Sequence, residues 1–163
     1  MSLYRVKQFY WSITSKIDTD DIQFVDKYLD GDEKELFDKL SIYEQKHSIK
    51  VARDVLNLCN NTNEVNLVKI ALLHDIGKIY GKLNPFEKSI MVVLDSISKG
   101  KLIRLKKIKK IDVYYNHSDK GYKLLKNTGK YDERFLYIIK NHHNNCIFGD
   151  KELDIIKRCD SNN

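Results

Sequence analysis

Residues that break helices are scarce in this sequence, and that scarcity limits most strongly the folds open to it. The 163 residues include one proline and seven glycines. Proline and glycine end helices and form the tight turns that many short strands need. Alternation of apolar and polar residues, the pattern of a half-buried strand, does not persist outside helical windows. The sequence therefore predicts an all-α fold.

Apolar residues at helical spacing, together with capping residues, divide the chain into expected helices. Their approximate ranges are 3–15, 19–29, 33–40, 41–60, 63–75, 85–98, 113–125, 132–144 and 151–160. Asp18 or Thr19 is expected to cap the second helix, and Gly31 to end it. Ser41–Glu44 has the form of a capping box. Gly77 is expected to stop the helix that delivers residues 74 and 75.

The chain is expected to form one compact domain. Its length suits a single core, and no linker, internal repeat or low-complexity tail interrupts it. We expect helices in residues 1–40 to pack on a core formed by residues 41–163. Hydrophobic residues make up 42% and charged residues 32%, which is typical of a folded globular protein rather than a disordered one.

Composition also favours a cytoplasmic protein that does not enter a membrane. No apolar run approaches the roughly 20 residues that a spanning helix needs. The first residues are charged and lack the apolar stretch and cleavage site of a signal peptide. Cys59, Cys146 and Cys159 are odd in number and widely spaced, which indicates free thiols in a reducing compartment.

The histidines of this chain occur in an ordered series together with aspartates. They are His47, His74, His117, His142 and His143, with Asp75 directly after His74 and Asp160 near the C-terminus. Imidazole and carboxylate together suit divalent cations such as Mn, Fe, Zn and Mg. Taken singly, His47 is typical of a core or cap histidine and His117 of a helix start. Their order in the sequence, together with His74–Asp75 and His142–His143, instead indicates a metal-centred hydrolase.

The segment 71–78, Ala-Leu-Leu-His-Asp-Ile-Gly-Lys, resembles the signature of the HD superfamily of metal-dependent phosphohydrolases, in its HDIG form. The resemblance extends over roughly residues 41–160 and leaves the first 40 residues unexplained. The further matching positions are His47, His117 followed by Gly121, the doublet His142–His143, and Asp160. The resemblance implies a single-domain helical bundle of the HD-domain type.

The resemblance also implies two divalent metal ions, Mn or Fe first, with Mg, Zn or Ni as alternatives. The motif aspartate commonly bridges both metals in this family, so Asp75 is expected to bridge and to be catalytic. The first ion would be held by His47, His74, Asp75 and Asp160, and the second by His117, His142, His143 and Asp75. A water between two cations loses its proton near neutral pH and becomes the nucleophile.

Two positions near this pattern have alternatives. Lys78 is implied by the resemblance to be a catalytic and substrate-binding residue that contacts a phosphate or leaving oxygen, but it also suits a cationic cap on a helix C-terminus. Asp160 lies close to the chain end, where fraying would remove it, and Asp154 is then the alternative ligand. Glu44, three residues before His47, is conceivable as a carboxylate for a third metal.

The basic segment, defined as residues 99–110, holds seven of the 29 basic residues and no acidic one. Without it the chain has 22 basic and 23 acidic residues, so the rest is close to neutral. The segment suits a solvated amphipathic helix or connector, a device that steers an anionic substrate, or a nucleic-acid contact. The residues expected to steer anions are Lys101, Arg104, Lys106 and Lys107. No RNA-reading motif supports the nucleic-acid interpretation.

The predicted function is a metal-dependent phosphohydrolase, a phosphomonoesterase or phosphodiesterase, acting on a nucleotide or related phosphoester. The doublet is followed by Asn144–Asn145, whereas cyclic-dinucleotide phosphodiesterases of the HD-GYP type carry Glu there. This departure and the basic segment motivate an alternative, a non-catalytic HD-fold module that senses a nucleotide or binds RNA. The expected partner is a small phosphorylated substrate, and the sequence does not indicate an oligomeric state.

Overall fold

The computed structural model of the protein describes residues 16–59 and 64–163. These residues are helical and contain no strand, which confirms the all-α prediction. The α-helices are α2 (Thr19–Tyr28), α3 (Gly31–Phe37), α4 (Ile42–Leu58), α5 (Glu64–Leu73), α6 (Pro85–Ile97), α7 (Lys109–Lys126), α8 (Glu133–Asn141) and α9 (Lys151–Asn162); two 3₁₀ helices are η1 (Ile76–Tyr80) and η2 (Lys101–Leu105). The helix predicted over 3–15 and the first residue of the helix predicted over 63–75 lie outside the described residues. None of the described helices could span a membrane.

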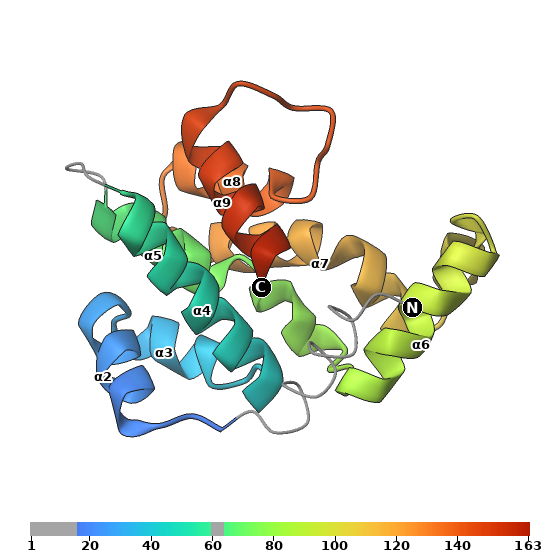
Figure 1. The fold of residues 1–163 in the computed structure, drawn as a ribbon, viewed down its shortest axis with the longest axis horizontal. Coiled ribbons are helices and arrows are strands. Elements are labelled where there is room, and N and C mark those ends of the chain that lie inside the picture. Colours follow the sequence, from blue (N-terminus) through green and yellow to red (C-terminus); the bar gives the residue numbers. More distant parts are fainter. Residues whose placement is uncertain (1–15, 60–63) are drawn as a thin grey trace.

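The core lies between the long central helices and the C-terminal pair (Figure 1). Helices α4 and α5 run side by side, α7 crosses behind them, and α8 and α9 close one end. The fully buried side chains include Val51 and Val55 of α4, Leu72 of α5, Ile139 of α8 and Ile156 of α9. Side chains of α2 and α3, among them Val25 and Phe37, belong to the same core cluster.

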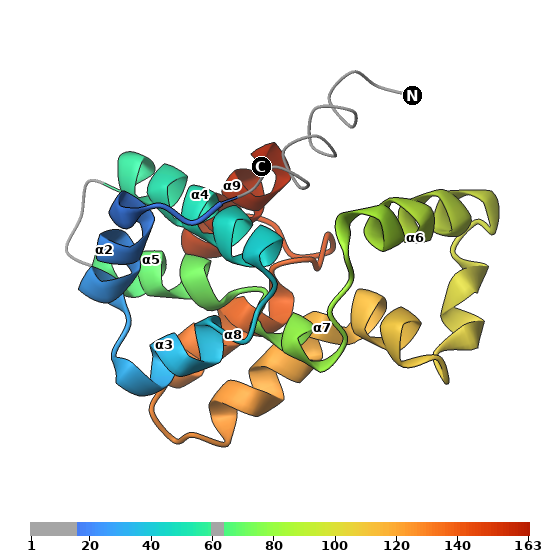
Figure 2. The same ribbon diagram turned by 90° about the horizontal axis from the view of Figure 1, so that it is seen from below.

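A second part of the fold, the arm, consists of α6, η2 and the first turn of α7 and projects from this body (Figure 2). The basic segment forms its tip. It is not one amphipathic helix, because α6 ends at Ile97, a turn with left-handed backbone at Lys99 and Gly100 follows, and only the short η2 precedes α7. Leu102 is buried while Leu105 is exposed, so the apolar residues of the segment do not share one buried face.

Two glycines do not end the helices that they were predicted to end. Gly31 is the first residue of α3, where Asp30 makes a complete capping box with Glu33, and α2 already stops at Tyr28. Gly77 lies within η1, because α5 stops at Leu73, before His74. The prediction was wrong at both sites because a glycine just beyond an apolar run was taken for a helix stop.

Gly77 is instead needed for close packing. A Cβ atom at this position would lie 1.9 Å from the carbonyl oxygen of His117 and 2.6 Å from the backbone nitrogen of Gly121. The glycine at 121 faces it: a Cβ there would lie 3.3 Å from Gly77 N and 3.3 Å from Ile76 Cγ2. This contact brings η1 against the middle of α7, and so places His74–Asp75 beside His117.

Replacing Gly77 by Ala should therefore lower the free energy of unfolding by about 3 kcal/mol, because backbone has to move to admit the methyl group. Gly31→Ala is the matched control, since nothing lies within 4 Å of a Cβ there. It should change stability by less than about 1 kcal/mol. Urea denaturation of both variants in EDTA measures the difference, and equal effects of the two substitutions would contradict the close-approach argument.

Candidate metal centre

Seven side chains from five parts of the fold converge on one place. His47 comes from the first half of α4, His74 and Asp75 from the turn after α5, and His117 from the middle of α7. His142 and His143 come from the end of α8, and Asp160 from the last turns of α9. The structure thus brings together the seven residues that the sequence assigned to the two metal ions. They form two groups, His47–His74–Asp160 and Asp75–His117–His142–His143, and each group offers atoms within 4.8 Å of one another.

The first group surrounds one oxygen of Asp160. Its Oδ1 lies 3.0 Å from His47 Nε2 and 3.5 Å from His74 Nε2. Asp75 Oδ2 also faces these two nitrogens, at 3.8 Å from His47 and 3.4 Å from His74. Ligand atoms that each lie about 2.1 Å from a shared ion are separated by roughly 3–3.5 Å. These spacings fit such an ion.

The second group lies on the other oxygen of Asp75. Asp75 Oδ1 is 3.2 Å from His117 Nε2 and 3.8 Å from His142 Nε2. His143 completes this group and also approaches Asp160, with Nδ1 3.7 Å from Oδ2. The two oxygens of Asp75 therefore face different groups, which is the arrangement that a bridging carboxylate requires.

Four buried polar atoms in these groups have no hydrogen-bond partner: Nε2 of His74, His117 and His142, and Oδ1 of Asp75. Unpartnered polar atoms are rare in protein interiors because each one costs free energy. Here all four point at one small space, and cations would supply the missing partner. The residues present therefore fit the metals that their types imply.

The orientation of three imidazoles is fixed by the backbone. Nδ1 of His74 lies 2.7 Å from the carbonyl oxygen of Ala71, Nδ1 of His142 lies 2.7 Å from that of Ile139, and Nδ1 of His117 lies 3.2 Å from that of Tyr114. A carbonyl only accepts, so each Nδ1 carries the proton and donates it. The lone pair is then on Nε2, directed at the site, which is the tautomer that a metal ligand needs.

Residues 45–161 match the family model of the HD domain, which spans both groups. The chain belongs to the HD domain family. Neither the curated proteins nor the solved structures gave a match. Membership accounts for the order of the ligands, and the fold shows how this HD domain assembles them.

The signature dipeptide of the HD domain lies just outside a helix. Because α5 ends at Leu73, His74 and Asp75 occupy a turn, and Asp75 adopts φ −96° and ψ 9°. The sequence placed both residues on the helix itself, which was wrong. The turn lets the adjacent side chains converge: His74 Nε2 lies 3.4 Å from Asp75 Oδ2, whereas successive residues of a helix point about 100° apart.

Burial and charge act against each other at these groups. Burial lowers the pKa values of His47 and His142. At His143, whose side chain is half exposed, partial desolvation and the neighbouring imidazoles of His142 and His117 lower the pKa to about 3, so these three rings are neutral. Burial also disfavours the protonated form of His74, but the carboxylates of Asp75 and Asp160 outweigh it and raise its pKa to about 10. Without a metal, a second proton, on Nε2 of His74, thus partly compensates the carboxylates, and a metal ion at the site would take the place of that proton.

Lys78 neutralises part of the carboxylate charge of the HD domain site. Its buried Nζ donates to Asp75 Oδ2 and lies 3.1 Å from Glu44 Oε2. Burial opposes the charged form of Lys78, but Asp75 and Glu44 outweigh it and raise the pKa of the ammonium further. The lysine is therefore not a cap on α5. Glu44 was recognised in the sequence as a capping-box residue. Ser41 Oγ does accept the Glu44 N–H, but the carboxylate is directed to Lys78.

Asp160, and not Asp154, is the carboxylate of α9 that lies at the site. It lies within α9, two residues before the helix ends, and contacts His47. Asp154 instead accepts from the backbone of Gly149. The helix continues past the point where the sequence suggested fraying. In addition, Asn163 closes its end with a side-chain contact to Asp54 of α4.

The site opens to solvent at one side. His143 has half of its side-chain surface exposed, whereas those of His74 and His142 are fully buried. Solvent therefore reaches the site beside His143. The side chains proposed to steer anions, Lys101, Arg104, Lys106 and Lys107, are all exposed on the arm and do not belong to either ligand group.

Removing Lys78 should leave buried carboxylates uncompensated. Lys78→Met is expected to lower the free energy of unfolding in EDTA by about 3 kcal/mol. The double variant Glu44→Gln/Lys78→Met should regain about 1 kcal/mol of that loss, since one buried charge is then gone. Urea denaturation gives both values. A double variant no more stable than Lys78→Met would show that Glu44 does not depend on Lys78.

Asp160→Asn should remove the first group's carboxylate and halve the metal bound by the chain, from about two equivalents to about one. Asp154→Asn is the matched control on the same helix and should keep both. Elemental analysis after loading with Mn and gel filtration measures the content. Equal metal content in the two variants would refute the assignment of Asp160 as a ligand.

Proposed function

We propose that this HD domain is a metal-dependent phosphohydrolase that cleaves a nucleotide or related phosphoester at a dinuclear centre. The observation that carries the proposal is the set of four buried, unpartnered ligand atoms that converge between the two groups. A cluster that served only stability would not leave them unsatisfied. Their types, imidazole nitrogen and carboxylate oxygen, suit Mn or Fe, with Mg, Zn and Ni as alternatives.

Formal charge favours two ions over one for a phosphate substrate. The site contains the carboxylates of Asp75, Asp160 and Glu44 and the single ammonium of Lys78, so neutral histidines leave it with two excess negative charges. One divalent ion would only neutralise that excess. A second would make the centre positive, and thus attractive to a phosphoryl group.

The metals would supply an activated water and polarise the phosphoryl oxygens. The protein's part is to hold the ligands in place. Asp75 offers one oxygen to each group, and the backbone carbonyls that accept from Nδ1 keep the imidazole rings turned toward the site. Lys78 holds Asp75 Oδ2 and brings a positive charge to within reach of a phosphate bound there. His143 stands at the exposed side of the site, where a phosphoester would enter.

The alternative is a non-catalytic module of the same fold that binds a nucleotide or RNA. It is favoured by the exposed basic segment and by the absence of a carboxylate after His143, where Asn144 and Asn145 follow. Such a module would bind without turnover. Its affinity would fall steeply with salt, and that dependence would disappear once the lysines of the basic segment were neutralised.

Elemental analysis of protein purified without chelator, followed by hydrolysis assays, tests the proposal. We expect about two equivalents of transition metal and hydrolysis of one or more members of a panel of nucleotides and p-nitrophenyl phosphate mono- and diesters. EDTA should abolish the activity, and Mn or Fe should restore it. Asp75→Ala should lose metal and turnover together, because one carboxylate serves both ions.

Asp154→Ala is the control, and it should keep both the metal content and the hydrolysis rate of the parent protein. Full metal content and full rate in Asp75→Ala would show that the site assignment is wrong. Stoichiometric metal with no hydrolysis anywhere in the panel, combined with tight nucleotide or RNA binding that Asp75→Ala leaves unchanged, would favour the binding module.

A further inference from the structure

Helix α6 presents its apolar face to solvent. The residues of that face, Phe86, Ile90, Val93, Leu94 and Ile97, are spaced at i, i+4, i+7, i+8 and i+11 and are all exposed. Phe86 is 63% and Ile97 is 74% exposed. Apolar stripes of this kind normally face a core. None of the α6 side chains that the structure describes is buried, and no described residue of the body covers the stripe.

The opposite, polar face of α6 holds the helix to the body. Lys88 Nζ lies 3.5 Å from Tyr43 Oη on α4 and Asp95 accepts from Tyr115 of α7, whereas Glu87 pairs with Lys110 in the first turn of α7, within the arm itself. The first two contacts fix which side of the helix faces inward. The fold therefore holds α6 in an orientation in which its apolar face points outward.

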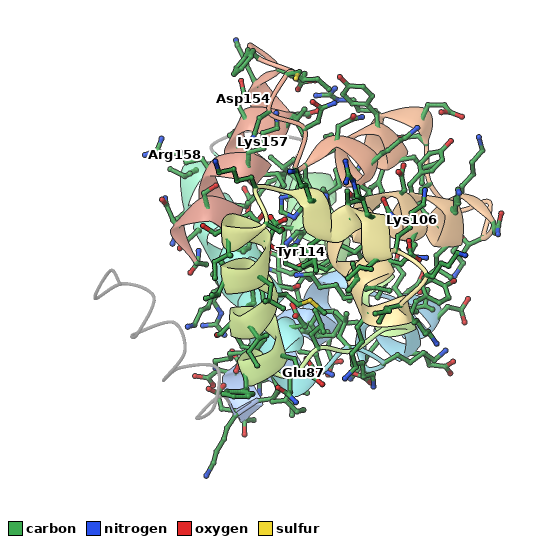
Figure 3. The ribbon with its side chains drawn as sticks, turned by 90° about the vertical axis from the view of Figure 1, so that its right-hand side faces the viewer. Glu87, Lys106, Tyr114, Asp154, Lys157 and Arg158 are labelled. Carbon is green, nitrogen blue, oxygen red and sulfur yellow. The ribbon has the colours of Figure 1, made fainter. Side chains whose placement is uncertain are left out.

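Cations lie beside the apolar stripe. The basic segment follows α6 directly and forms the tip of the same arm, with Lys106 just beyond η2 (Figure 3). Exposed aliphatic side chains alternate with its lysines: Ile103, Leu105 and Ile108 are each about half exposed. The arm thus combines an apolar helix face, further aliphatic side chains and seven basic residues with no acidic residue among residues 99–110.

We propose that the arm is a peripheral membrane anchor that lays the apolar face of α6 into the surface of a bilayer containing anionic phospholipid. Interfacial helices bind in this way, with apolar side chains in the headgroup–acyl boundary and lysines on lipid phosphates. This revises the expectation that no membrane is involved, which rested on the lack of a spanning segment. The proposal goes beyond the hydrolase activity and does not depend on it.

The side chains favour lipid over the other occupants of such a surface. An RNA would use the lysines, but it would gain little from five exposed apolar residues on α6, four of them aliphatic, because single strands stack on aromatic rings. A second copy of the chain would cover the apolar stripe but would bring another strongly basic segment close to the first. Only an anionic lipid surface matches both the apolar and the cationic parts.

Vesicle sedimentation of the full-length protein tests the proposal. We expect binding to phosphatidylcholine vesicles that contain 30% phosphatidylserine, weaker binding as salt is raised, and little binding to pure phosphatidylcholine. Ile90→Asp/Ile97→Asp should abolish it. Lys106→Gln/Lys107→Gln should weaken it about 30-fold, at about fivefold for each basic side chain. The apolar and basic controls are Phe148→Asp and Lys123→Gln/Lys151→Gln, exposed positions outside the arm that should bind as the parent does.

Three outcomes would overturn the proposal. The first is no binding of the parent protein to phosphatidylserine vesicles. The second is binding that the lysine variants lose but Ile90→Asp/Ile97→Asp keeps, which would mark a plain polyanion surface; anisotropy with a labelled 20-nucleotide RNA would then identify it. The third is a dimer, seen by light scattering after gel filtration, that only Ile90→Asp/Ile97→Asp dissociates, with no vesicle binding. Circular dichroism confirms that each variant is folded.

Discussion

The burial of Asp75 is the constraint on which the rest of this structure depends. Its side chain is 1% exposed, and a carboxylate loses several kcal/mol of hydration when it is buried. The fold has to bring positive charge to it. Lys78 supplies that charge at Oδ2, and the imidazoles around both oxygens complete ligand groups in which cations would supply the rest. Glu44 then follows as a consequence: the ammonium that neutralises Asp75 is itself buried, and a second carboxylate from α4 shares its charge. One buried aspartate thus brings together side chains from η1, from α4, from α7 and from the end of α8.

The C-terminal ends of two helices supply the backbone carbonyls that orient the histidine ligands. The last carbonyls of a helix lack the amide partner that interior carbonyls have. Ala71 lies in the last turn of α5 and Ile139 in the last turn of α8, and each accepts from the Nδ1 of the histidine three residues on. One contact therefore satisfies a carbonyl and turns Nε2 toward the site. The C-terminal ends of both helices also carry partial negative charge, which favours a cation nearby.

The identity of the ligands was predictable, whereas the path of the backbone that delivers them was not. The order of histidines and aspartates in the sequence predicted the seven residues that converge, because residue type limits what can bind a metal. The apolar period predicted α5 but not its end at Leu73, since the pattern continues through Ile76 and a glycine follows. The purpose of Gly77 depends on the carbonyl of His117, which lies 40 residues away in sequence and beside it only in the folded chain. The ion pair of Glu44 and Lys78 was not predictable for the same reason, because the two residues meet only in the folded chain.

The arm shows a different limit of sequence patterning. The spacing of apolar residues in α6 predicts that one face is apolar, but it does not say which way that face points. That direction is decided by the polar contacts of Lys88 and Asp95 with α4 and α7 of the body. Fully burying a large aliphatic or aromatic side chain is worth about 1.5–3 kcal/mol, and the fold forgoes this at each exposed position of the stripe. A helix that leaves its apolar face outward, and anchors its polar face inward, keeps that free energy available for a surface outside the chain.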